Sequence, residues 1–122
     1  MRGWFVIAAI LGGAAVVLGA IGAHALKNLA PLSHEAFNTA SAFHMYHALA
    51  MGLAALMMPY SPVWAPRAAM AFLAGIILFS GSLYLWSLTG IHGLGFITPV
   101  GGLALIIGWG LLALAGWKLE ER

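Results

Sequence analysis

Four long runs of apolar residues follow one another along the chain, separated by short segments with proline, glycine and charged residues. The runs cover residues 3–25, 36–58, 68–88 and 99–117. A helix needs about twenty apolar residues to cross a hydrocarbon core of roughly 30 Å, and each run is close to that length. The pattern therefore predicts an all-α fold, an integral membrane bundle of four transmembrane helices with short loops. Residues 1–122 are then a single membrane domain.

The first run also has features of a cleavable signal peptide. Arg2 precedes it, and Ala23-His24-Ala25 at its end fits the small-x-small pattern of a cleavage site. The apolar run is longer than the roughly 7–15 residues of a signal sequence. We therefore expect it to remain as the first membrane span.

Proline and hydroxyl residues predict where the later helices begin. Pro31 breaks the apolar pattern, and Ser33 is expected to cap the second helix with Glu35 in its first turn. Pro66 is expected at the first position of the third helix, where its missing N–H costs nothing. In the Thr98-Pro99 pair, the threonine is expected to cap the fourth helix.

Polar residues distinguish the second run from the others, since it contains Asn38, Ser41, His44 and His47. If the span ends at Met58, it starts near Thr39, which places His47 close to the middle of the bilayer. Ionisable side chains at that depth are costly and indicate a functional site by default. The second half of the third run is polar as well and carries four such side chains, Ser80, Ser82, Tyr84 and Ser87.

The composition agrees with a membrane protein and excludes several functions. Hydrophobic residues make up 63% of the chain and charged residues 7%, with a mean hydropathy of +1.00; about a quarter of a soluble domain is charged. The charges lie near the predicted span ends, so there is no basic patch for nucleic acid. The chain has no cysteine, which excludes disulfides, thiolate metal sites and cysteine nucleophiles.

The distribution of basic residues predicts the orientation. Four spans place both termini on one side of the membrane, together with Arg2, Arg67, Lys118 and Arg122, whereas the other side has only Lys27. Basic residues are enriched in cytoplasmic loops, so both termini are expected in the cytoplasm. The polar half of the bundle then faces outward, either as a vestibule or because its polar side chains pair with one another.

Small residues recur along the first and fourth runs at helical spacing. Stripes of this kind let another backbone approach closely, so we expect helix contacts at five glycines, Gly12, Gly19, Gly22, Gly101 and Gly108. Four of the five tryptophans lie near span ends, as in an aromatic belt. Trp109 is the exception and is expected to pack inside.

His44 and His47 are three residues apart and therefore point nearly the same way from a helix. Two imidazoles at this spacing can bind copper or zinc, with further ligands from His24 or His92. The alternative is that both are structural histidines bonded to serine, tyrosine or carbonyl partners. Ser33-His34-Glu35 does not form a hydrolase triad, because triads assemble from separate elements.

Several short stretches together identify a resemblance that covers nearly the whole chain. They are Gly19-Ala20-Ile21-Gly22-Ala23-His24-Ala25-Leu26, His47-Ala48-Leu49-Ala50, Leu78-Phe79-Ser80-Gly81-Ser82-Leu83-Tyr84, Thr98-Pro99-Val100-Gly101-Gly102 and Gly108-Trp109. In order and spacing the chain resembles the small membrane proteins known as domain of unknown function 423. The resemblance implies four helices, with bacterial inner-membrane members and eukaryotic relatives.

The positions that match this family suggest where a site lies. The polar ones are His24, His47, Ser80, Ser82, Tyr84 and Thr98. His44 departs from the pattern, where glutamine is expected; glutamine is a poor transition-metal ligand, which favours a polar network centred on His47 over a paired-histidine metal site. We expect His47 to bond to Ser80, Ser82 or Tyr84, because an unpaired buried imidazole costs free energy.

These observations favour a structural or interaction protein of the inner membrane, either a homo-oligomer or an accessory subunit of a membrane complex. The expected partners are the lipid bilayer and either a second copy or another membrane protein. We expect no enzymatic activity and no cofactor. One alternative is a small-solute transporter or channel that uses the outer polar cluster; another is a metal- or haem-binding membrane protein.

Overall fold

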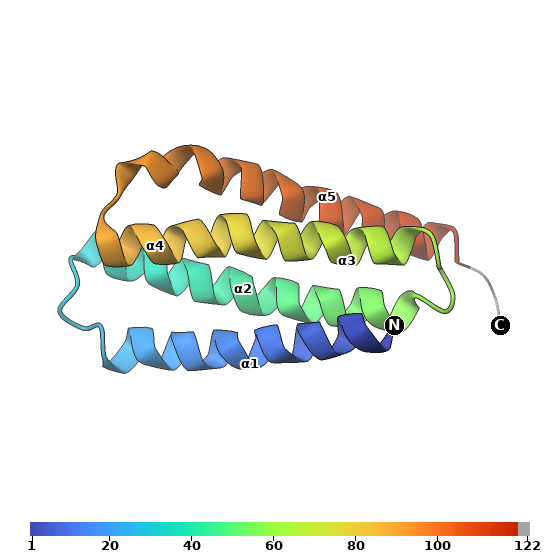
Figure 1. The fold of residues 1–122 in the computed structure, drawn as a ribbon, viewed down its shortest axis with the longest axis horizontal. Coiled ribbons are helices and arrows are strands. Elements are labelled where there is room, and N and C mark those ends of the chain that lie inside the picture. The colour runs from blue at the N-terminus through green and yellow to red at the C-terminus, as the bar shows by residue number, and fades with distance from the viewer. Residues whose placement is uncertain (120–122) are drawn as a thin grey trace.

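The computed structural model describes residues 1–119, except for the side chains of residues 92 and 93. The described part is all-α, as predicted, and consists of helices joined by short loops (Figure 1). The elements in chain order are α1 (Arg2–His24), α2 (Pro31–Met57), α3 (Trp64–Gly75), η1 (Ile76–Ser80), α4 (Gly81–Thr89), η2 (His92–Phe96) and α5 (Ile97–Trp117). The elements α3, η1 and α4 follow one another without a loop and form one long helical segment.

Four helical segments in the described part of the chain are long and apolar enough to cross a membrane. They are Arg2–His24, Pro31–Met57, Trp64–Thr89 and Leu94–Trp117. Each includes the core of one predicted apolar run. The second, third and fourth segments begin before the predicted runs, because the helices continue through flanking residues such as Ser33, Arg67 and Thr98.

The helices begin at different residues from those predicted. Pro31 is the first residue of α2 and Ala30 its N-cap, so Ser33 lies inside the first turn and is not the cap. Proline suits this position because the first N–H groups of a helix have no partner within it. Likewise α3 begins at Trp64 and α5 at Ile97, so Pro66 and Thr98 also lie inside the first turn.

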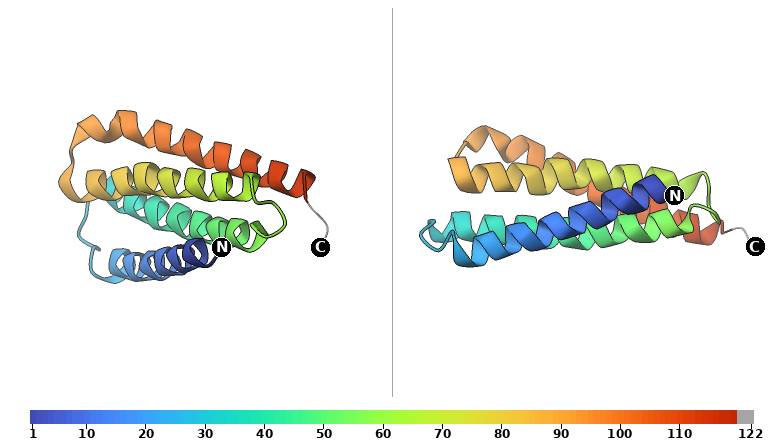
Figure 2. Two further views of the ribbon diagram at one scale, coloured as in Figure 1. Left: turned by 45° about the vertical axis from the view of Figure 1, so that its right-hand side comes forward. Right: turned by 60° about the horizontal axis from the view of Figure 1, so that its bottom comes forward.

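The helices are arranged as a row with α1 at one end and α5 at the other. Within the described residues α1 packs against α2, α2 against α3, η1 and α4, and α5 mainly against α3 and η1. The left view of Figure 2 shows the same order, and in its right view α5 crosses obliquely behind the other helices. The start of α1 and the end of α5 lie at the same end of the bundle's long axis (Figure 1). Both outer helices are thus packed on one side only.

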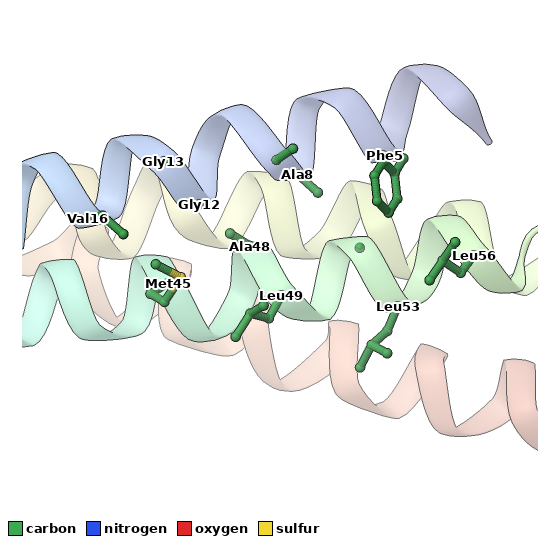
Figure 3. Close-up of a pocket in the computed structure, with 12 residues that line it drawn as sticks. Phe5, Ala8, Gly12, Gly13, Val16, Met45, Ala48, Leu49, Leu53 and Leu56 are labelled. Atoms are coloured by element: carbon green, nitrogen blue, oxygen red, sulfur yellow. The ribbon is translucent and has the colours of Figure 1, made fainter.

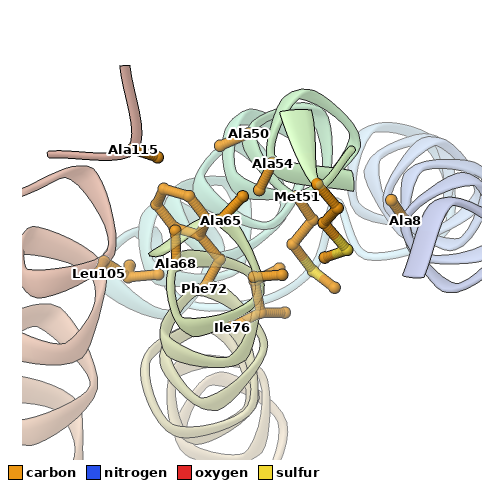
Figure 4. Close-up of a cluster of buried hydrophobic side chains, with 12 residues drawn as sticks. Ala8, Ala50, Met51, Ala54, Ala65, Ala68, Phe72, Ile76, Leu105 and Ala115 are labelled. Carbon is orange, nitrogen blue, oxygen red and sulfur yellow. The ribbon is translucent and has the colours of Figure 1, made fainter. Parts of the chain in front are cut away.

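The core lies between α2 and α3, where small residues bring the two helices close together. Ala54, Ala65 and Ala68 are completely buried there, and Met51 and Phe72 fill the remaining space (Figure 4). In lipid there is no water to drive apolar surfaces together, so close van der Waals contact holds the helices. A core made mainly of alanine provides this contact over a long stretch of helix.

The five predicted glycine contacts differ in tightness. A Cβ added to Gly101 would overlap with the backbone of Leu78 and Phe79, and a Cβ on Gly108 would lie 2.6 Å from the Phe72 ring. On α1, a Cβ on Gly22 would lie 2.7 Å from the Phe37 ring. These three positions require glycine for close approach.

The other two predicted glycines lie at looser contacts between α1 and α2. A Cβ on Gly12 would lie 4.0 Å from Ala48 and Met45, and one on Gly19 would lie 3.8 Å from Ser41 Oγ. Both distances are ordinary van der Waals separations. The tight contacts therefore occur mainly where α5 packs on α3 and η1, and the α1–α2 contact leaves more room.

The element η1 is a turn of π-helix within the third span. The N–H of Gly81 bonds to the carbonyl of Ile76, an i→i+5 bond. This turn faces the Gly101 region of α5, whose missing side chain allows the two backbones to touch. Because a π-turn has more residues per turn than an α-helix, it rotates every following side chain about the helix axis. The directions of Ser82 and Tyr84 depend on this rotation.

Candidate functional site

His47 lies near the middle of α2 and is 5% exposed. Its Nδ1 bonds to the carbonyl of Phe43 one turn earlier at 2.7 Å, and its Nε2 bonds to Nε1 of Trp109 in α5 at 3.1 Å. The prediction that His47 bonds to Ser80, Ser82 or Tyr84 is therefore wrong. Its ring points toward α3 and α5, where it packs against Phe72 and Trp109.

The two bonds of His47 fix its chemical form. A carbonyl oxygen only accepts, so Nδ1 carries the proton; the indole Nε1–H only donates, so Nε2 accepts. His47 is then a neutral imidazole with both nitrogens in use. A metal ion at Nε2 would have to displace the Trp109 indole.

His44 points in a different direction from α2 and contacts other elements. Its Nδ1 is 2.9 Å from the hydroxyl of Tyr84 in α4, and its ring is also close to that of Tyr84. Its Nε2 is buried without a hydrogen-bond partner in the described residues. The backbone of Leu11 in α1 lies beside this ring. His44 therefore lies between α1 and α4.

The serines and Thr98 make separate contacts of their own. Ser80 Oγ donates to the carbonyl of Ala40 at 2.8 Å and joins η1 to α2. Ser82 Oγ donates to the carbonyl of Phe79 and pairs with Thr98 Oγ1, so it joins α4 to α5. The residues of the predicted cluster thus form separate interhelical hydrogen bonds and do not form one network around His47.

The structure does not bring His24 into this series. Its side chain is exposed at the last turn of α1, and among the described residues it makes no hydrogen bond. The connection at this end of α1 comes from His34, whose Nε2 donates to the carbonyl of Gly22 at 3.0 Å. Asn38 Nδ2 lies 3.4 Å from His34 Nδ1 and completes the contact.

The described residues contain no group of three metal-ligating side chains. His44 and His47 bond in different directions, toward Tyr84 and Trp109 respectively, so the two rings do not converge on one point. The side chain of His92, the other candidate ligand, lies outside the described residues.

Trp109 was not predicted from the sequence as the hydrogen-bond partner of His47. Its position in the middle of the fourth run was the available signal, because a polar indole N–H inside a membrane needs a partner. The ring is half-exposed, so it packs inside only in part. Trp109 also lies edge-on to Phe72, with ring centroids 5.2 Å apart.

Two hollows flank α2. One, of about 530 Å³, lies between α2, η1 and α5 and is lined by Phe43, His47, Phe79, Pro99, Gly102, Leu103, Leu105, Ile106 and Trp109. The other is a groove of about 460 Å³ between α1 and α2 (Figure 3). Small residues line much of this groove, including Ala8, Ala9, Gly12, Gly13, Ala48 and Gly52.

Comparison with known proteins agrees with the architecture. Residues 18–102 match the family described as "Protein of unknown function (DUF423)". The UPF0382 membrane protein YwdK of Bacillus subtilis (strain 168) is 40% identical over 121 residues, which are 97% of this chain and 98% of that protein. The UPF0382 membrane protein SAB0533 of Staphylococcus aureus is 37% identical over 119 residues, 97% of this chain and 98% of that protein.

A third relative carries a more specific name. The UPF0382 inner membrane protein YgdD of Escherichia coli (strain K12) is 34% identical over 123 residues, which are 99% of this chain and 94% of that protein. No solved structure matches this chain. The three relatives are membrane proteins, and the similarity covers nearly the whole of each.

Proposed function

This chain belongs to the DUF423 family of membrane proteins, and from that premise we propose that it is a non-enzymatic structural protein that works by helix association within the membrane. The observation that carries the proposal is the one-sided packing of α1. In its apolar window 17% of the residues are buried, the same share as in the last span and well below the 50% in α2; what distinguishes α1 is the groove lined by small residues beside it. A helix with this much free surface has room for another helix.

The free face of α1 has the composition that helix association requires. Ala9, Gly13 and Ala20 are exposed there, and a Cβ on Gly13 would meet no other heavy atom of the described chain within 4 Å. Small residues let a second backbone come close, and helix association in lipid depends on that contact. The groove between α1 and α2 continues this surface (Figure 3).

We propose that the occupant is α1 of a second copy. Two identical faces with small residues at Ala9, Gly13 and Ala20 can approach each other about a two-fold axis, so that each Gly13 region contacts its equivalent. The polar side chains of the site support this structural role, since they bond to each other and to backbone carbonyls between helices. Such pairing stabilises a protomer, whereas a solute path requires polar groups that stay accessible.

The proposal extends to the orientation of the protein in the membrane. Arg2 begins α1, Arg67 lies in the first turn of α3 and Lys118 follows α5, all at the same end of the bundle's long axis. Lys27 lies at the other end, and Arg122 lies outside the described residues. Because cytoplasmic loops are enriched in basic residues, the termini belong in the cytoplasm.

The experiment that tests the association is a measurement of oligomeric state in lipid nanodiscs with Gly13→Leu. Leucine at this position fills the groove without entering the protomer core, so the fraction of dimer should fall. Gly110→Leu on α5 is the matched control, because a Cβ there also meets nothing within 4 Å in the described chain. A wild-type protein that is monomeric, or a dimer that persists in Gly13→Leu, contradicts the proposal; a dimer with a different membrane protein identifies the accessory-subunit role.

A further inference from the structure

The hollow between α2, η1 and α5 has the properties of a small-molecule site. Its volume of about 530 Å³ lies within the range of roughly 300–1,000 Å³ that is typical of ligand pockets. It is separate from the α1–α2 groove, because α2 lies between the two. A ligand here is therefore independent of the proposed association through α1.

Aromatic rings form much of the wall. Phe43 and Phe79 lie with ring centroids 5.0 Å apart, and Phe43 stacks on His47 with an interplanar angle of 28°. Trp109, edge-on to His47, belongs to the part of the wall that α5 contributes. Aromatic rings attract other flat rings by offset stacking and edge-to-face contact, so this wall suits a ligand with an aromatic ring.

One polar pair interrupts the apolar lining, the bond between Trp109 Nε1–H and His47 Nε2. The pair offers one donor and one acceptor on neighbouring atoms. A hydroxyl is complementary to both, because it donates through its hydrogen and accepts through its oxygen. An ether or a carbonyl could accept from Trp109 but would leave His47 Nε2 unpaired.

We propose that this cavity binds a lipid-soluble phenol whose hydroxyl inserts between His47 Nε2 and Trp109 Nε1. Trp109 is 45% exposed, whereas the His47 ring is buried and held by its bond to the Phe43 carbonyl. The ring of the ligand lies between Phe43, Phe79 and Trp109. The bond between His47 and Trp109 holds the site closed until a hydroxyl replaces it.

The position of the cavity indicates entry from the bilayer. Leu103 and Ile106 at its rim are 58% and 68% exposed, and both belong to α5, a membrane-capable helix. The wall residue Phe79 belongs to the π-helical turn η1. Turns of this kind are frequent at functional sites, and this one places the Phe79 ring against the rim.

The test uses nuclear magnetic resonance of the full protein in nanodiscs, with 15N-labelled indoles and two probes. The first is 4-octylphenol; the second is its methyl ether, 4-octylanisole, which has the same ring and chain but no hydroxyl proton. The Trp109 indole signal, assigned with Trp109→Phe, should shift saturably with the phenol. The ether should bind roughly tenfold more weakly, the equivalent of one lost hydrogen bond.

A variant that fills the cavity provides a second criterion. A Cβ on Gly102 would lie 3.6 Å from the Phe79 ring, so Gly102→Leu places its side chain in the cavity and leaves the polar pair intact. It should abolish the saturable shift, while Gly110→Leu should bind as the wild type does. Equal binding of phenol and ether, an unsaturable response, or undiminished binding by Gly102→Leu would each overturn the inference.

Discussion

The indole Nε1 of Trp109 donates a hydrogen bond of 3.1 Å to Nε2 of His47, and the two residues are 62 positions apart in the sequence. The bond joins α2 to α5, which contact each other far less than either contacts α3. The imidazole that the sequence places near mid-bilayer is thereby paired with a donor that has no other partner in the described chain.

The first prediction concerns this bond. Trp109→Phe keeps an aromatic ring against Phe72 but removes the donor, so His47 Nε2 loses its partner. Interhelical hydrogen bonds in membranes average about 0.6 kcal/mol, and we expect a loss of stability of this order in detergent. Trp117→Phe, at an 87% exposed position in the last turn of α5, should leave the melting temperature unchanged; an equal effect of both changes would contradict the prediction.

A second prediction concerns the close approach of α5 to η1. Gly101→Ala adds a Cβ that overlaps with the backbone of Leu78 and Phe79, and overpacking of this kind costs about 1–3 kcal/mol. Thermal unfolding in detergent should show a clear decrease. Gly110→Ala, on the same helix with open space around it, should be neutral or slightly stabilising because alanine favours helix.

The two glycines on α1 should respond differently to the same change. Gly22→Ala places a Cβ 2.7 Å from the Phe37 ring and should destabilise the protein. Gly19→Ala places its Cβ 3.8 Å from Ser41 Oγ, an ordinary contact, and should be tolerated. If thermal unfolding ranks the two variants in the opposite order, the packing of α1 on α2 differs from that described.

A fourth prediction concerns His44. Tyr84→Phe removes the hydroxyl that bonds to Nδ1, and since Nε2 has no partner among the described residues, neither ring nitrogen then has one there. We expect a stability loss of roughly 0.6–1.7 kcal/mol, within the range of single interhelical bonds in membranes. Tyr46→Phe on the exposed face of α2 is the control, and it should unfold at the wild-type temperature.

The orientation is tested with reporters that are active on one side of the membrane only. A cytoplasmic reporter fused to the C-terminus should be active, and a periplasmic reporter should be active when inserted beside Lys27. The reverse pattern would show that the excess of basic residues on the side of the termini does not set the topology.

The sequence predicts the fold well because apolar runs of membrane-spanning length allow only helices in lipid. Helix starts are less predictable; Pro31 interrupts an apolar pattern yet suits the first position of α2. Ser80, Ser82, Tyr84 and Thr98 do make contacts between helices, as polar residues in a membrane must.

The partner of His47 could not be predicted from the sequence for two physical reasons. Which helices are neighbours depends on the row order, and α5 reaches His47 only because α5 packs along α3 and η1. The π-helical turn also rotates Ser82 and Tyr84 relative to a continuous α-helix. Neither the order of the helices nor the π-helical turn can be recognised from the pattern of apolar and polar residues in the sequence.

The central claim, association of two copies through α1, is tested most directly by cysteine cross-linking in native membranes. The chain has no cysteine of its own, so single cysteines report one position each. Ala9→Cys and Gly13→Cys should form disulfide-linked dimers on mild oxidation, whereas Ile106→Cys on the exposed face of α5 should stay monomeric. No dimer at Ala9 or Gly13, or an equally strong dimer at Ile106, would contradict the claim.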